Sequence, residues 1–169
     1  GPIEEGSQTA SANAVIPALT AAFNKPNVKA IVLAIDSPGG KPGESERIYN
    51  FIDAKRKETN KPVVAVIGNT GASAAYMIAV HTDKIYAGKY SVVGSIGAIL
   101  TSWDFHKIAE RFDVKHKVYA SGALKGMLDP WTPSSPEAEA KAQDIVNNMG
   151  KVFAKEVAQL RKSTLAAGV

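Results

Sequence analysis

Two short apolar runs, each followed by a turn of small residues and then by a helical pattern, constrain the fold of this chain most. The runs are Ala30–Ile35 (AIVLAI) and Pro62–Ile67 (PVVAVI), and the helical patterns cover about Gly43–Glu58 and Ser73 to Val80. Continuous runs rich in β-branched residues are typical of strands that are covered on both faces. The alternation of strands and helices therefore predicts a layered α/β domain with a central sheet.

The remaining segments fit the same architecture. A first helix is predicted over Ser7–Phe23, with its first turns disturbed by Pro17, and a long last helix over Ser135–Lys162 carries one apolar stripe. That stripe requires cover from the same subunit or from a neighbour. The shorter predicted elements are strands at Lys84–Ala87 and Ser91–Leu100, a helix at Asp104–Phe112 and an extended segment at Lys117–Tyr119.

Composition limits the classes of protein to which this chain can belong. Its 169 residues are 45% hydrophobic, which predicts a single domain over residues 1–169 with a sizeable core. The net charge is +4, but the lysines and arginines are spread among acidic residues and are not interleaved with aromatic residues. Nucleic acid is therefore not an expected partner. The absence of cysteine excludes disulfides, thiol nucleophiles and cysteine-based zinc sites. We expect no metal and no cofactor.

The sequence also bears on location. No apolar stretch reaches the roughly 18 to 20 residues that cross a bilayer, so we expect the chain as given to be soluble. The first predicted helix begins close to Gly1, which suggests a fragment that lacks an N-terminal segment. The compartment stays unknown on this evidence.

Ser73 is the residue whose surroundings indicate a chemical role most clearly. It lies in Gly71–Tyr76 (GASAAY), where a strand turns into an apolar helix and small neighbours leave its hydroxyl room to meet a substrate. One interpretation is a nucleophile, and the other is a helix N-cap. The two overlap, because a helix N-terminus also stabilises the negative charge that develops in acyl transfer.

A serine nucleophile needs an adjacent base, which is commonly histidine and in a minority of hydrolases lysine. His81 is too near Ser73 in sequence for an obvious partner geometry, and His106 and His116 sit in polar surroundings. Lysine acts as a base only where desolvation or a nearby positive charge lowers its pKa from about 10.4 toward about 7. Lys125, within the small and apolar SGALKG, is the candidate base, and an ordinary surface lysine is the alternative.

Two glycine-containing turns complete the candidate site. Gly39 and Gly40 follow a strand in DSPGG, and with the N–H of Ala74 their backbone donors would form an oxyanion hole; a plain Pro-Gly turn is the alternative. In Gly94–Gly97 (GSIG), Ser95 either belongs to a simple turn or orients Lys125.

Five ordered motifs between about Ile31 and Pro130 resemble the signal peptide peptidase A (SppA) family. The motifs, in chain order, are DSPGG at 36–40, GASAAY at 71–76, DKIYA at 83–87, VGSIG at 93–97 and SGALK at 121–125. Five motifs in this order are far more specific than any one of them. Their spacing is also similar to that in the family.

The resemblance implies a Clp/crotonase-type fold and a Ser/Lys dyad serine peptidase. The implied roles are Ser73 as nucleophile, Lys125 as general base, Ser95 as the residue that hydrogen-bonds the lysine, and Gly39 or Gly40 with Ala74 as oxyanion donors. It also implies a homo-oligomer with active sites between subunits, so that Lys125 serves a neighbour's Ser73. Membrane association is implied only through a missing N-terminal anchor.

The resemblance further implies cleavage of extended, unfolded or membrane-derived peptides such as signal peptide remnants. This sequence departs from the family pattern at two places: Ala74 and Ala75 replace a common Gly-Gly pair, and Leu124 replaces a frequent aromatic residue before the lysine. The alternatives are a crotonase-like acyl-CoA hydratase or isomerase, which needs carboxylates that the residues near Ser73 do not offer, and a non-catalytic peptide-binding scaffold.

Overall fold

The structure is a computed structural model that describes residues 1–6 and 9–162. Contacts divide the chain into two compact units, Gly1–Gly97 with Phe153–Val169, and Ala98–Val152. The single domain over residues 1–169 stays a prediction. Ser7, the expected start of the first helix, lies outside the described residues.

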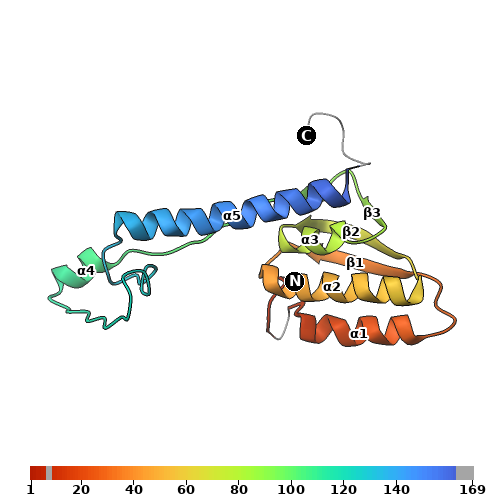
Figure 1. Cartoon of the computed structure of the whole chain (residues 1–169), viewed down its shortest axis with the longest axis horizontal. Helices are drawn as coiled ribbons and strands as arrows, with labels where there is room; N and C mark the ends of the chain where they lie inside the picture. The colour runs from red at the N-terminus through yellow and green to blue at the C-terminus, as the bar shows by residue number, and fades with distance from the viewer. Residues whose placement is uncertain (7–8, 163–169) are drawn as a thin grey trace. The chain divides into compact units, whose positions relative to one another are not determined.

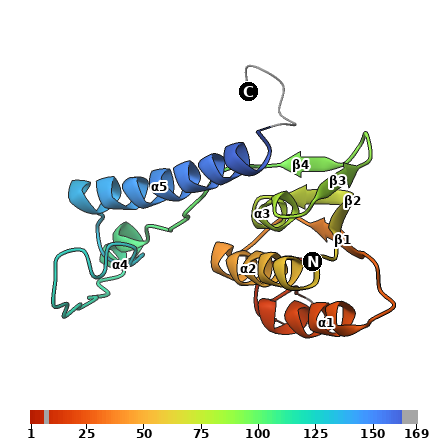
Figure 2. The ribbon, with the colours of Figure 1, turned by 45° about the vertical axis from the view of Figure 1, so that its right-hand side comes forward.

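A parallel sheet is the centre of the first unit. Its strands are β1 (Ile31–Ser37), β2 (Val63–Ala72), β3 (Lys84–Ala87) and β4 (Val92–Gly94). The order is β1-β2-β3, and β4 pairs with β2 further along its length, from Thr70 onward. Because β2 is long, it pairs with β3 near its start and with β4 near its end, as Figure 2 shows.

Three helices belong to this unit: α1 (Ala12–Asn24), α2 (Pro42–Thr59) and α3 (Ala74–Val80). α1 and α2 lie side by side along one face of the sheet (Figure 1). The core between the helices and the sheet consists of apolar side chains, most of them small or branched. Among them are Phe23, Ile48, Ile52, Val63, Ala75 and Ile78. The α/β architecture and the bounds of β1, α2, α3 and β3 agree with the sequence prediction to within about two residues.

The opposite face of the sheet is open in the part of the chain that the structure describes. Alternate residues of a strand point to opposite faces, and the outward positions Val32, Val66 and Tyr86 are 63%, 41% and 54% exposed. The expectation that the strands are covered on both faces is therefore wrong for the described residues. An apolar run predicts that both faces are covered, but it does not show which part of which molecule covers the second face.

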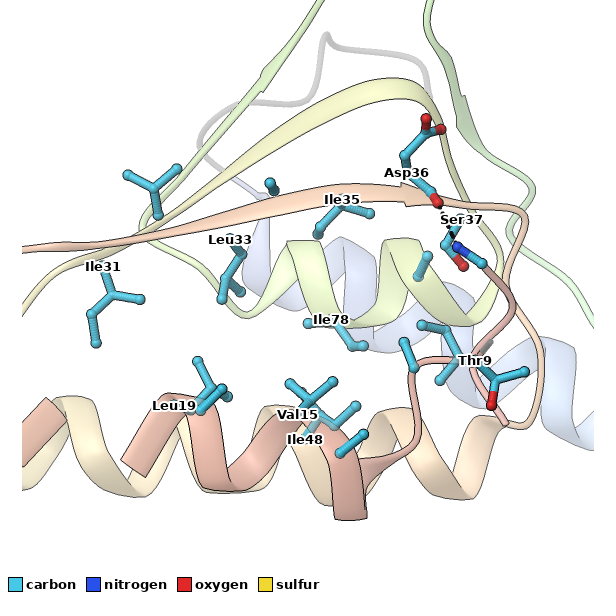
Figure 3. A pocket seen from close by; sticks show the side chains of 18 of the residues that line it. Thr9, Val15, Leu19, Ile31, Leu33, Ile35, Asp36, Ser37, Ile48 and Ile78 are labelled. Atoms are coloured by element: carbon cyan, nitrogen blue, oxygen red, sulfur yellow. Dashed lines mark hydrogen bonds between the residues drawn. The ribbon is translucent and has the colours of Figure 1, made fainter. Parts of the chain in front are cut away.

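The edge of β1 borders an apolar groove. A cavity of about 530 Å³ lies between β1 and α1, and its lining includes Val15, Leu19 and Leu33 (Figure 3). Among residues 1–6 and 9–162, the pairing on this side of β1 is limited to its carboxyl end and the turn after it: the amine of Gly1 donates to the Asp36 carbonyl at 3.1 Å, and Ile3 forms a parallel bridge with Gly40.

The carboxyl end of α5 (Pro136–Leu160) packs in the first unit through Phe153 and Val157, which contact Val80. Next to them, the buried imidazole of His81 lies 2.7 Å from the Asp53 carboxylate and 3.2 Å from the Glu156 carboxylate. These polar contacts fix the end of α3 that is remote from Ser73.

The second unit contains α4 (His106–Arg111), the first part of α5 and long irregular segments. The predicted strand at Ser91–Leu100 is reduced to β4, because only three of its residues pair with β2. The segment Lys117–Tyr119 has no strand partner in the described residues, and Tyr119 is 92% exposed. Trp103, Phe105 and Trp131 form a small aromatic cluster.

Candidate active site

Ser73 occupies the N-cap position of α3, but its hydroxyl does not cap the helix. Its backbone has φ 50° and ψ −125°, outside the regions that a non-glycine residue normally adopts. Its N–H donates to the Gly94 carbonyl at 2.8 Å, and its carbonyl accepts from the Met77 N–H at 3.0 Å. The turn is thus held by its backbone, and the half-buried hydroxyl is left available for other partners.

Unusual backbone conformations gather around Ser73. Among the described non-glycine residues, four have positive φ: Ser73, Ser95, Asn60 and Asp113. The glycines with positive φ are Gly39, Gly40 and Gly94, all of which belong to the motifs singled out in the sequence. Such conformations cost about 1–3 kcal/mol each at non-glycine residues and cluster at functional sites.

Gly39 lies directly against the serine. A β-carbon built on Gly39 would be 2.7 Å from the Ser73 Cβ and 2.9 Å from the Ala74 nitrogen, too close for any side chain. The Gly39 N–H donates to the buried Ser37 hydroxyl at 3.2 Å. The structure therefore brings the DSPGG turn and the GASAAY turn together in the first unit.

We expect Gly39→Ala to destabilise the protein by about 1–3 kcal/mol and to reduce the reactivity of Ser73, because the methyl group meets the Ser73 Cβ and φ is +107°. Gly43→Ala is the matched control: it has open space around it and lies in the first turn of α2, where alanine is favourable. Thermal melts and a serine-directed labelling rate test this. Equal behaviour of the two variants would contradict it.

Lys125 and Ser95 are less constrained. Lys125 lies in a turn of the second unit, where its N–H donates to the Gly122 carbonyl at 3.1 Å and its side chain is exposed in the single chain. Ser95 follows β4 in the first unit and is also exposed. The predicted contacts of Lys125 with Ser73 and with Ser95 stay predictions.

Each of the three histidines pairs with a carboxylate. His81, in the first unit, contacts Asp53 and Glu156 at the end of α3 opposite to Ser73. In the second unit, His106 pairs with Asp104, and His116 with Asp129 at 2.7 Å. The hydrogen bonds of His106 lower the pKa of the Asp104 carboxyl. These pairs were not predicted from the sequence, although the Asp104-Phe105-His106 segment places a carboxylate two residues before a histidine.

The sequence analysis also missed Ser45, whose buried hydroxyl donates to the Ala74 carbonyl at 2.7 Å. A signal was present, because Ser45 lies at helical spacing with Ile48 and Ile52, at the start of their apolar stripe.

Comparisons with known proteins identify the fold class and the family of this chain. The Clp protease family model matches residues 3–89, which include the parallel strands β1 to β3, so the Clp/crotonase-like fold class is confirmed. The model described as Peptidase family S49 matches residues 55–167, more than half of the chain. The chain belongs to peptidase family S49, and the resemblance to the SppA family is confirmed.

Relatives carry several names. A putative signal peptide peptidase SppA from Enterococcus faecium is 35% identical over 79% of this chain and 39% of that protein. The putative protease slr0021 from Synechocystis sp. is 32% identical over 86% of this chain and 51% of that protein. A Na(+)/H(+) antiporter NhaA from Brucella melitensis is 37% identical over 75% of this chain, but over only 16% of that protein.

This chain thus spans about half or less of these relatives. In the part of the chain that the structure describes, no helix is both long enough and apolar enough to cross a membrane.

Proposed function

We propose that this chain is a serine peptidase domain in which Ser73 is the nucleophile and Lys125 the general base. The observation that supports this most is the conformation of Ser73: a strained serine starts α3, and its hydroxyl makes no capping bond to the helix it precedes. Membership of a peptidase family adds independent support.

In the proposed mechanism, the neutral Nζ of Lys125 takes the proton of the Ser73 hydroxyl while Oγ bonds to the carbonyl carbon of a peptide. The tetrahedral intermediate collapses, the peptide C–N bond breaks, and the lysine ammonium gives its proton to the leaving amine. Water, deprotonated by the same lysine, then hydrolyses the acyl-enzyme and restores Ser73. Ser95 is proposed to orient the lysine by a hydrogen bond.

The proposed oxyanion donors are the N–H groups of Gly40 and Ala74. Gly39 is the weaker candidate of the two glycines, because its N–H already donates to Ser37. Ile3 bonds to the Gly39 carbonyl and to the Lys41 N–H, so the peptide groups of Gly40 point to the other side of this segment. Ala74 opens α3, and the first N–H groups of a helix have no partner within the helix.

The proposed substrates are extended or unfolded peptides, including membrane-derived ones such as signal peptide remnants. The name of the Enterococcus relative supports this choice. We further propose that the chain acts as a homo-oligomer, in which Lys125 meets the Ser73 of a neighbouring subunit, and that residues outside this chain associate the whole protein with a membrane. The exposure of Lys125 in the single chain is consistent with a base that is desolvated by a neighbour.

A serine-directed fluorophosphonate tests the proposed class of enzyme. We expect the folded protein to be labelled at one site, located at Ser73 by peptide mass spectrometry, and we expect labelling to disappear after denaturation. Labelling at another residue, or none, would overturn the assignment. A rise of the melting temperature with coenzyme A in place of labelling would favour the acyl-CoA alternative.

A further inference from the structure

The first turn of α2 carries a polar side chain that is fully buried. Ser45 is 0% exposed, and it shares a helix face with Ile48 and Ile52, which are 1% and 0% exposed. Its hydroxyl donates to the carbonyl of Ala74 at 2.7 Å, across 29 positions of sequence. A hydroxyl buried at this depth is tolerated because it is satisfied, and its partner is the residue directly after Ser73.

This hydrogen bond joins the two segments that carry the proposed oxyanion donors. Gly40 directly precedes Lys41, the N-cap residue of α2, and Ser45 lies in the first turn of that helix. The position of the Gly40 peptide is therefore coupled to the start of α2. Ala74 is the first residue of α3, and its own N–H is the second donor. The Ser45 hydroxyl is therefore a direct link between one donor segment and the other.

The remaining contacts act in a complementary way. Gly39 has no space for a β-carbon toward Ser73, which sets the closest approach of the two segments. The Ser45 hydrogen bond resists their separation. The start of α2 is itself held by Glu44, which accepts a hydrogen bond from the Ala12 N–H at 2.7 Å; this bond lowers the pKa of the Glu44 carboxyl.

We propose that Ser45 is a positioning residue that fixes the spacing between the N–H groups of Gly40 and Ala74. This inference rests on the proposed peptidase function, because it assigns to Ser45 the geometry of that oxyanion hole. Two donors stabilise a developing oxyanion only when both lie about 2.7–3.1 Å from the place where it forms. A small increase in their spacing weakens binding of the transition state more than binding of the substrate.

The same helix provides a matched control. Thr82, which is 4% exposed, has its hydroxyl 2.7 Å from the Ala79 carbonyl, at the end of α3 remote from Ser73, and 3.0 Å from the Lys84 carbonyl. Ser45→Ala and Thr82→Val each remove one buried hydroxyl that bonds to a carbonyl of α3. They differ in which end of the helix loses its bond, and Thr82→Val also removes the contact with Lys84.

The experiment measures kcat, KM, the inhibition constant of a peptide aldehyde and the melting temperature for both variants. We expect both to melt at a lower temperature than the unmodified protein. Ser45→Ala should lower kcat about 10- to 100-fold with KM within twofold, and should weaken the aldehyde by a similar factor, because the aldehyde forms an oxyanion on Ser73. Thr82→Val should keep kcat within about twofold. Ser45→Cys, which keeps a weak donor, should lie between.

Equal losses of kcat in Ser45→Ala and Thr82→Val would overturn the inference and leave Ser45 a purely structural residue. A higher KM with unchanged kcat would overturn it as well. Absence of both cleavage and labelling in the unmodified protein would instead overturn the proposed function, and this inference with it. If Ser45→Ala does not fold, Ser45→Cys is compared with Thr82→Val by the same measurements of kcat, KM, aldehyde inhibition and melting temperature, and that comparison decides the inference.

Discussion

Ser73→Ala is expected to abolish peptide cleavage and fluorophosphonate labelling while the protein stays folded. The loss in kcat/KM should reach about 10⁴-fold or more, as for removal of other serine nucleophiles, because no covalent acyl intermediate can form. The effect on stability should be small, since the Ser73 hydroxyl makes no capping bond to α3. Cleavage of a fluorogenic peptide and a thermal melt monitored by circular dichroism test both parts.

The matched control is Ser134→Ala, which removes an exposed hydroxyl outside the candidate site. It should retain both cleavage and labelling. Cleavage that persists in Ser73→Ala at the unmodified rate would refute the nucleophile, and with it the mechanism proposed above.

Lys125→Ala is expected to have an effect of similar size, at least about 10³-fold in kcat, because the serine hydroxyl loses its base. Lys125→Arg should be equally inactive, since a guanidinium keeps the charge but does not deprotonate. Lys117 is also exposed and lies in the same unit as Lys125, so Lys117→Ala is the control and should remain active.

Activity of the unmodified protein should rise with pH into the alkaline range, because the base works only after losing its proton. A flat profile from about pH 6 to 9 would count against a lysine base.

Mixing the two inactive variants distinguishes sites within a subunit from sites between subunits. If Lys125 serves a neighbour's Ser73, co-assembled Ser73→Ala and Lys125→Ala chains should regain about a quarter of the activity for random mixing, since half of the serines and half of the lysines are intact. Sites formed within one subunit would regain nothing. The two variants assembled separately provide the baseline.

The sequence predicted the strands and helices that carry strong local patterns. β1, β3 and α3 appear close to their expected positions because β-branched runs and small-residue turns determine conformation within a few residues. Ser73 was predicted at a strand-to-helix turn for the same reason. Its positive φ and the contact with Gly39 were not predictable, because they depend on a segment more than 30 positions away.

Two other features could not be predicted from the local sequence pattern. The stretch from Ser91 to Leu100 looks uniformly strand-like, but pairing with β2 is available to Val92–Gly94 only. Ser45 appears in the sequence as a polar residue at the start of an apolar stripe, and its partner Ala74 becomes evident only when α2 packs on α3. The motif resemblance indicated the residues of the candidate site. The hydrogen bonds that favour Gly40 over Gly39 as an oxyanion donor became evident only in the folded backbone.

The outer edge of β1 has a practical consequence for handling this molecule. In the described residues this edge is paired only near its carboxyl end, and the main-chain donors and acceptors along the rest of it are a template for any extended polypeptide, including another copy of the same chain. Adhesion through that edge would be concentration-dependent and independent of sequence, and it would mimic a specific complex in a sizing experiment. Dilution series, rather than a single elution volume, are therefore the appropriate way to judge how many copies associate.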